Sequence, residues 1–108
     1  MDRDAYQAET ARILTERIES LRKMTFSEAS SLPAARGEDA VVAGQKATIT
    51  VFRQDSPYQL SGKILVTVLV ARERWFGIAA HHTERGLVFS PDESVREAAQ
   101  LELQNSGG

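Results

Sequence analysis

The stretch KILVTVLVAR, residues 63–72, decides the fold class of this 108-residue chain. Side chains alternate along a β-strand, and both alternating sets of this stretch are apolar apart from one threonine. One set contains Ile64, Val66, Val68 and Val70, and the other contains Leu65, Leu69 and Ala71 with Thr67. A strand that is apolar on both faces usually lies in the middle of a sheet. We therefore predict a β-sheet with residues 63–72 as its central strand.

Alternating patterns on both sides of this stretch predict two hairpins. Their strands are expected at Asp39–Ala43, Gln45–Arg53, Trp75–His82 and Gly86–Ser90. The pair Gly44-Gln45 suits a type II′ turn in the first hairpin, and Thr83-Glu84-Arg85 is expected to form the turn of the second. None of the connections is long enough for a parallel crossover. The sequence therefore predicts an antiparallel β-meander of four to five strands.

A long helix is predicted over Asp4–Met24. Its apolar stripe has spacings of three and four residues and consists of Ala11, Leu14, Ile18 and Leu21. Opposite charges on its outer face fall at helical spacing, in the pairs Glu9/Arg12, Arg12/Glu16 and Glu19/Lys23. Thr25-Phe26-Ser27-Glu28 has the form of a capping box, which predicts a short second helical turn that ends before Pro33. Residues 33–39 are expected to form a loop.

A short C-terminal helix is predicted from Ser90-Pro91-Asp92-Glu93. This tetrapeptide combines an N-cap serine, a proline at the first helical position and a glutamate three residues after the cap. The apolar stripe of this helix would be Val95, Ala98, Ala99 and Leu103. Together these elements predict a single α+β domain over residues 1–108, with both helices packed on the sheet and with frayed ends at 1–3 and 105–108.

Composition and charge exclude several classes of protein. The chain has no cysteine, so disulfide frameworks, thiolate metal sites and cysteine nucleophiles are excluded. The acidic start Met1-Asp2-Arg3-Asp4 does not resemble a signal peptide, and no apolar run approaches the ~20 residues of a membrane helix. We expect a cytoplasmic protein that does not enter the membrane. Residues 44–90 carry only three positive charges in excess, too few to favour nucleic-acid binding.

The two histidines are the candidates for a metal or catalytic site. His81 and His82 are adjacent, so on a strand they would point to opposite faces, and with Glu84 they do not reach the ligand number of a zinc site. Either imidazole could act as a general base, but no recognisable nucleophile accompanies it. We therefore predict no catalytic residue, no metal site and no cofactor.

The first functional hypothesis is a non-enzymatic binding or protein–protein interaction module. Two helices cover one face of a sheet, and the second apolar face of the central strand then needs another cover, for which a homodimer is the simplest solution. The alternative is a small-ligand or nucleic-acid site. Its residues would be the cationic and aromatic group Arg72, Arg74, Trp75, His82 and Arg85.

Overall fold

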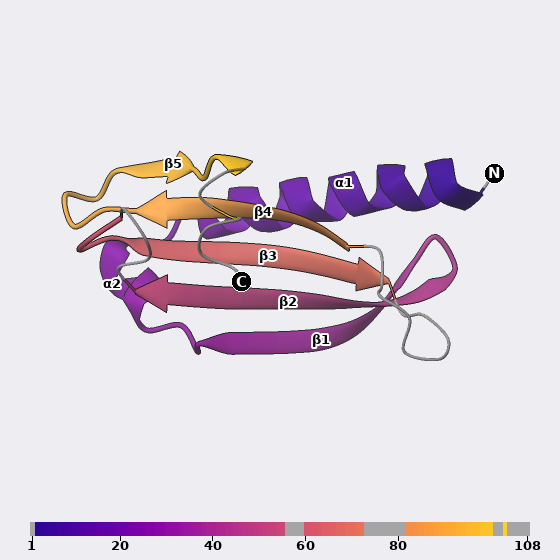
Figure 1. Cartoon of the computed structure of the whole chain (residues 1–108), viewed down its shortest axis with the longest axis horizontal. Coiled ribbons are helices and arrows are strands. Elements are labelled where there is room, and N and C mark those ends of the chain that lie inside the picture. Colours follow the sequence, from indigo (N-terminus) through magenta and orange to yellow (C-terminus); the bar gives the residue numbers. More distant parts are fainter. Residues whose placement is uncertain (1, 56–59, 73–81, 101–102, 104–108) are drawn as a thin grey trace.

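The computed structural model describes residues 2–55, 60–72, 82–100 and 103 (Figure 1). It confirms the predicted α+β class. An antiparallel sheet of five strands has the order β1-β2-β3-β4-β5, so each strand pairs with its neighbour in the sequence. The strands are β1 (Ala35–Val42), β2 (Gln45–Asp55), β3 (Ile64–Arg72), β4 (His82–Phe89) and β5 (Val95–Glu97). The predicted central strand is β3, in the middle of the sheet.

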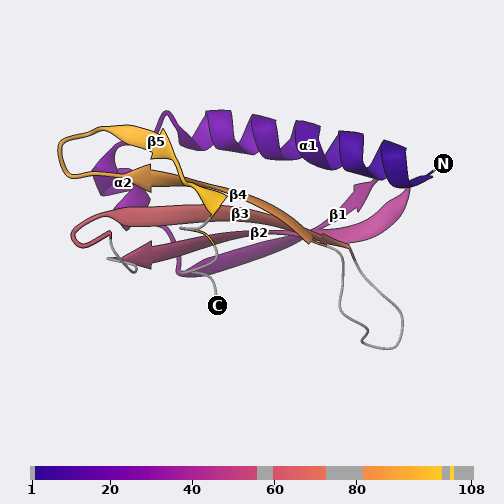
Figure 2. The same cartoon turned by 45° about the horizontal axis from the view of Figure 1, so that its top comes forward.

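Helices α1 (Asp2–Leu21) and α2 (Phe26–Ser30) lie on the same side of the sheet (Figure 2). Every fourth residue of α1 is buried against the sheet, namely Tyr6, Thr10, Leu14 and Ile18. Tyr6, Leu14 and Ile18 of α1 and Ala29 of α2 belong to the main core, together with the β3 side chains Ile64, Val66, Val68 and Val70. The expected pairs Glu9–Arg12 (2.7 Å) and Arg12–Glu16 (2.8 Å) are present, whereas Glu19 pairs with Arg22.

The capping box of α2 is confirmed, because Glu28 N–H donates to Thr25 Oγ1 at 3.1 Å and Thr25 N–H donates to Glu28 Oε1 at 2.8 Å. The turn type of the first hairpin was wrong. Val42 pairs with Gln45, so the loop is Ala43-Gly44. Both loop residues have positive φ, 49° and 78°, as a type I′ turn requires. The expected loop at residues 33–39 was also too long, since β1 begins at Ala35.

The expected turn at Thr83-Glu84-Arg85 was wrong as well. These residues lie inside β4 and pair with Val70, Leu69 and Val68 of β3. The long apolar strand β3 offers a pairing partner along its whole length, which outweighs the weak strand preference of the triplet. Except for His82, the predicted strand Trp75–His82 lies outside the described residues.

The predicted start of the C-terminal helix was also wrong. Ser90–Glu93 form a turn, in which Glu93 N–H donates to the Ser90 carbonyl at 2.9 Å and Ser90 N–H donates to the Ser94 carbonyl at 3.0 Å. Glu93 has φ 72°, which no α-helix accommodates. Ser-Pro-Asp is therefore used here as turn chemistry, and β5 follows. Helical backbone occurs at Gln100 and Leu103, where Leu103 N–H donates to the Ala99 carbonyl at 3.1 Å.

Candidate functional site

Two of the predicted ligand-binding residues, Arg72 and Arg85, lie on the helix side of the sheet, at positions four residues apart along β3. Arg72 ends β3, with its guanidinium carbon 5.5 Å from the centre of the Tyr6 ring. Arg85 lies opposite Val68 in the neighbouring strand. His82 begins β4, but its side chain is outside the described part, as are all of Arg74, Trp75 and His81. The predicted group is thus described only at its two arginines, both close to α1.

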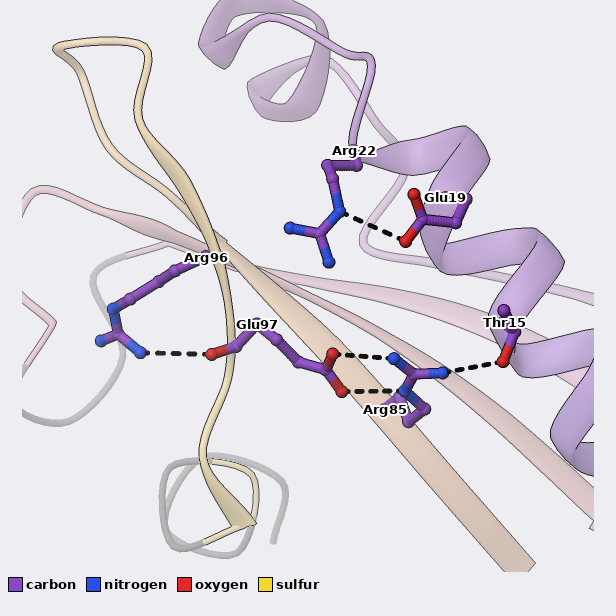
Figure 3. Close-up of polar contacts among 6 residues, drawn as sticks. All are labelled: Thr15, Glu19, Arg22, Arg85, Arg96 and Glu97. Atoms are coloured by element: carbon purple, nitrogen blue, oxygen red, sulfur yellow. Dashed lines mark hydrogen bonds and ion pairs between the residues drawn. The ribbon is translucent and has the colours of Figure 1, made fainter.

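Arg85 links three elements of the fold (Figure 3). Its Nε and Nη2 donate to the two carboxylate oxygens of Glu97 in β5 at 2.8 and 2.7 Å, and its Nη1 donates to Thr15 Oγ1 of α1 at 3.1 Å. These hydrogen bonds raise the pKa of Arg85 and lower the pKa of Glu97. Because Arg85 already binds Glu97 and Thr15, it has little capacity left to hold an anion. The neighbouring Arg96 donates to the Glu97 carbonyl at 3.5 Å, as Figure 3 also shows.

A cavity of about 380 Å³ lies between α1 and β4. Six of its lining residues belong to α1 and two to β4: Tyr6, Gln7, Thr10, Ala11, Leu14, Thr15, Thr83 and Arg85. No acidic side chain is among them. This volume lies within the range of small-ligand pockets.

Two residues that line this cavity, Tyr6 and Thr10, carry hydroxyl groups that are buried away from its open space. Tyr6 is 5% and Thr10 is 3% exposed, and neither the phenolic oxygen nor Thr10 Oγ1 is satisfied. Burial raises the pKa of Tyr6, against smaller lowering effects of Thr10 and the Arg72 cation. An unsatisfied buried hydroxyl normally costs about 1–3 kcal/mol, so the pair is unusual for a purely structural position.

The same groove exposes one edge of β4. Strand β5 pairs only with Leu87–Phe89, and the last contact of this ladder is Ala98 N–H donating to the Gly86 carbonyl at 2.8 Å. Backbone groups of alternate residues point to the same edge of a strand. The N–H and C=O groups of Glu84 and His82 therefore face the edge that β5 leaves uncovered. Figure 1 shows β5 along one half of β4 and α1 along the other.

The sheet face opposite the helices is covered at one end. Leu65 and Val88 are buried there by Leu60, Ala98 and Leu103. Toward β1 the face is more open, and no described helix or strand lies over it. Phe52 is 36% exposed, and five further residues of this face are half-buried: Thr48, Thr50, Thr67, Leu69 and Ala71. Charges of both signs, Asp39, Lys46 and Glu84, stand around it.

A second cavity, of about 420 Å³, lies between the end of α1 and β1. The ion pair of Arg17 with Glu38, at 2.7 Å, joins two of its walls. Across the described ranges, no three histidine or acidic side chains gather as metal ligands. Within the same ranges, no helix has both the length and the apolar character to cross a membrane.

Sequence reasoning missed Tyr6 and Thr10 as site residues. The usable signal is the four-residue spacing Tyr6, Thr10, Leu14, Ile18, which places two hydroxyl side chains on the buried stripe of the helix. The sequence provides no indication of the β4 edge, because it predicts a turn at Thr83-Glu84-Arg85. Comparison of the chain with protein-family models, with curated proteins and with solved structures found no match.

Proposed function

We propose that this protein is a non-enzymatic protein–protein interaction module that forms a homodimer through the open face of its sheet. The observation that carries this proposal is the one-sided cover of the sheet. Both helices pack on the face of Val66 and Val68, while Phe52 and Leu69 lie on the opposite face, the first of them 36% exposed.

The composition of the open face supports a second copy of the chain as its partner. Its middle is uncharged, with Thr50, Thr67 and Leu69 beside Phe52. An uncharged centre surrounded by a charged rim is typical of protein–protein interfaces. The rim has both signs, from Lys46 and the acidic residues around it, so a two-fold arrangement can set opposite charges against each other. A surface with this charge balance does not favour nucleic acid.

Light scattering coupled to size exclusion tests the proposal. We expect a dimer mass for the wild type at micromolar concentration and a monomer mass for Leu69→Lys, which places a charge at the centre of the open face. Ala8→Lys is the matched control, since Ala8 is exposed on α1, and it should remain dimeric. A wild type that is monomeric from one to several hundred micromolar would overturn the proposal.

No described residue supports the enzymatic alternative. One observation favours the ligand-binding alternative, namely the cavity beside Arg85. A ligand-binding role for the predicted arginines remains a prediction. The cytoplasmic location likewise remains a prediction of the sequence.

A further inference from the structure

We propose that the cavity between the end of α1 and β1 binds a small monocarboxylate with an aliphatic tail, whose carboxylate is held by Arg36 and whose tail lies on the apolar side chains beside Leu32. The cavity has a volume of about 420 Å³, within the range of small-ligand sites. It lies on the helix side of the sheet. It is therefore separate from the open face proposed for the dimer, and each proposal can fail without the other.

Apolar side chains from three parts of the chain form the floor of this cavity. They are Leu21 of α1, Leu32 and Pro33 of the segment before β1, and Val51 of β2. The leucines and the valine pack against the main core but are only half-buried. Covering apolar surface of this kind gains about 25 cal/mol per Å². An alkyl chain suits the floor, because it brings no polar group that needs a hydrogen bond there.

The charged groups that line the cavity are two arginines and one glutamate. Arg17 pairs with Glu38 at 2.7 Å, so these two charges compensate each other. Arg36 is exposed and has no hydrogen bond or ion pair with another described residue. The lining therefore has one positive charge in excess. A single carboxylate compensates it and can accept two parallel hydrogen bonds from the planar guanidinium.

The register of β1 brings the Arg36 side chain to the same face as the apolar floor. Arg36 lies directly opposite Val51 of β2, and residues opposite each other in a ladder share a face. Glu38, two residues further along β1, is on this face too, where it meets Arg17 of α1. The cation that is free to bind a ligand thus lies between the apolar floor and the edge of the sheet.

A backbone donor stands next to this cation. Gly37 lines the cavity and, having no side chain, does so with backbone atoms. Arg53 N–H donates to the Ala34 carbonyl at 3.0 Å, so the backbone groups of Ala34 and Arg36 face β2. The groups of the residues between them face the other way. Because β1 is an edge strand, the Gly37 N–H has no strand partner among the described residues and can donate to the carboxylate bound by Arg36.

The charge of the lining selects a monocarboxylate over other ligands. A phosphate monoester carries about −1.5 to −2 at neutral pH, which is more than Arg36 alone compensates, and Glu38 would repel the excess. A neutral apolar molecule would use the floor but leave Arg36 without a counterion. A carboxylate with an alkyl tail uses the floor, the guanidinium and the Gly37 amide at once.

The test is an NMR titration of the full chain with sodium octanoate, in which backbone amide shifts are recorded. We expect saturable binding with the largest shift changes at Leu32 and Gly37. Sodium acetate lacks the tail and octan-1-ol lacks the charge, so each should bind at least about tenfold more weakly than octanoate. Leu69→Lys, which changes the open face, should bind octanoate as the wild type does.

Substitution of Arg36 tests the role of its charge. Arg36→Gln removes the charge at an exposed position, so it should keep the wild-type circular dichroism spectrum and bind octanoate at least about tenfold more weakly. Arg36→Glu reverses the charge and should bind octylamine more tightly than the wild type does. Arg12→Ala is the matched control, because Arg12 is exposed on α1 and does not line the cavity. It should bind octanoate as the wild type does.

Several results would overturn the proposal. The first is that millimolar octanoate leaves the amide shifts of Leu32 and Gly37 unchanged. The others are that acetate or octan-1-ol binds as tightly as octanoate, or that Arg36→Gln binds octanoate as the wild type does. Binding that shifts the amides of Thr50 and Leu69 instead, and that Leu69→Lys abolishes, would place the ligand on the open face and would also overturn it.

Discussion

Two neighbouring residues of β3 should respond in opposite ways to the same substitution. Val68 is 0% exposed and lies in the main core, whereas Leu69 is half-buried on the open face. Replacing Val68 with lysine removes about 1.5–3 kcal/mol of apolar burial and puts an ammonium group into the apolar core. We expect a total loss of at least about 4 kcal/mol, the level reached by an unpaired buried charge.

Leu69→Lys should cost much less. The flexible lysine stem can lie along the sheet and keep its charged end in water, so we expect a loss of under about 1.5 kcal/mol, as for other tolerated surface changes. Since a domain of this size is stable by only about 5–15 kcal/mol, Val68→Lys should lose a large part of the stability of the protein, and Leu69→Lys should keep most of it.

Urea denaturation followed by far-ultraviolet circular dichroism measures this difference. Each protein is measured at several concentrations, because dimer formation stabilises the wild type by mass action. Equal losses for the two variants, or a greater loss for Leu69→Lys, would refute the assignment of the two faces. A folded Leu69→Lys that is still dimeric would leave the faces as assigned and would remove the dimer interface from the open face.

Three further results are expected. Ala43→Asn should stabilise the protein by about 0.5–1 kcal/mol in thermal or urea unfolding, because asparagine tolerates the positive φ of this turn position better than alanine does; a lower midpoint would contradict the turn type. Glu97→Gln should cost at most about 1 kcal/mol at neutral pH, since its ion pair with Arg85 is partly exposed. The pKa of Glu97 is lowered in the folded state, so this difference from the wild type should be present above the ordinary glutamate pKa and vanish as the pH falls through the folded value; a difference that grows in acid would contradict the ion pair. Gly86→Ala should destabilise by about 1–3 kcal/mol, because its Cβ would lie 3.0 Å from the Val66 carbonyl oxygen, and an unchanged urea midpoint would contradict that close approach.

Elements with a local signal could be predicted from the sequence. The two-sided apolar pattern of residues 63–72 placed β3 in the centre, and the Thr25–Glu28 capping box placed α2, because both signals depend on neighbours within one element. The errors occurred where two local interpretations compete. Ser90-Pro91-Asp92 suits both a helix start and a turn, and only the pairing of β4 with β5 decides for the turn.

The candidate site was less predictable than the fold. Arg85 could be found as a cation, but its engagement by Glu97 could not, because that contact depends on the β4–β5 pairing. Tyr6 and Thr10 could be placed on a helix, but their lack of partners depends on what packs around them. A site formed between elements that are distant in the sequence leaves little trace in local patterns.

The path of the chain after β5 leads from the edge of β4 to the open face of the sheet. Ala98 makes the last contact with the β4 edge, and the chain then crosses to the other face, where Leu103 approaches Gly86 and covers Leu65 and Val88. Had β5 continued in its ladder, residues after Ala98 would have paired with Glu84 and His82 and closed the groove beside α1. Because the chain crosses over instead, it covers one end of the open face, and half of the β4 edge has no strand partner among the described residues. The length of β5 therefore sets how much of the open face is available to a second copy.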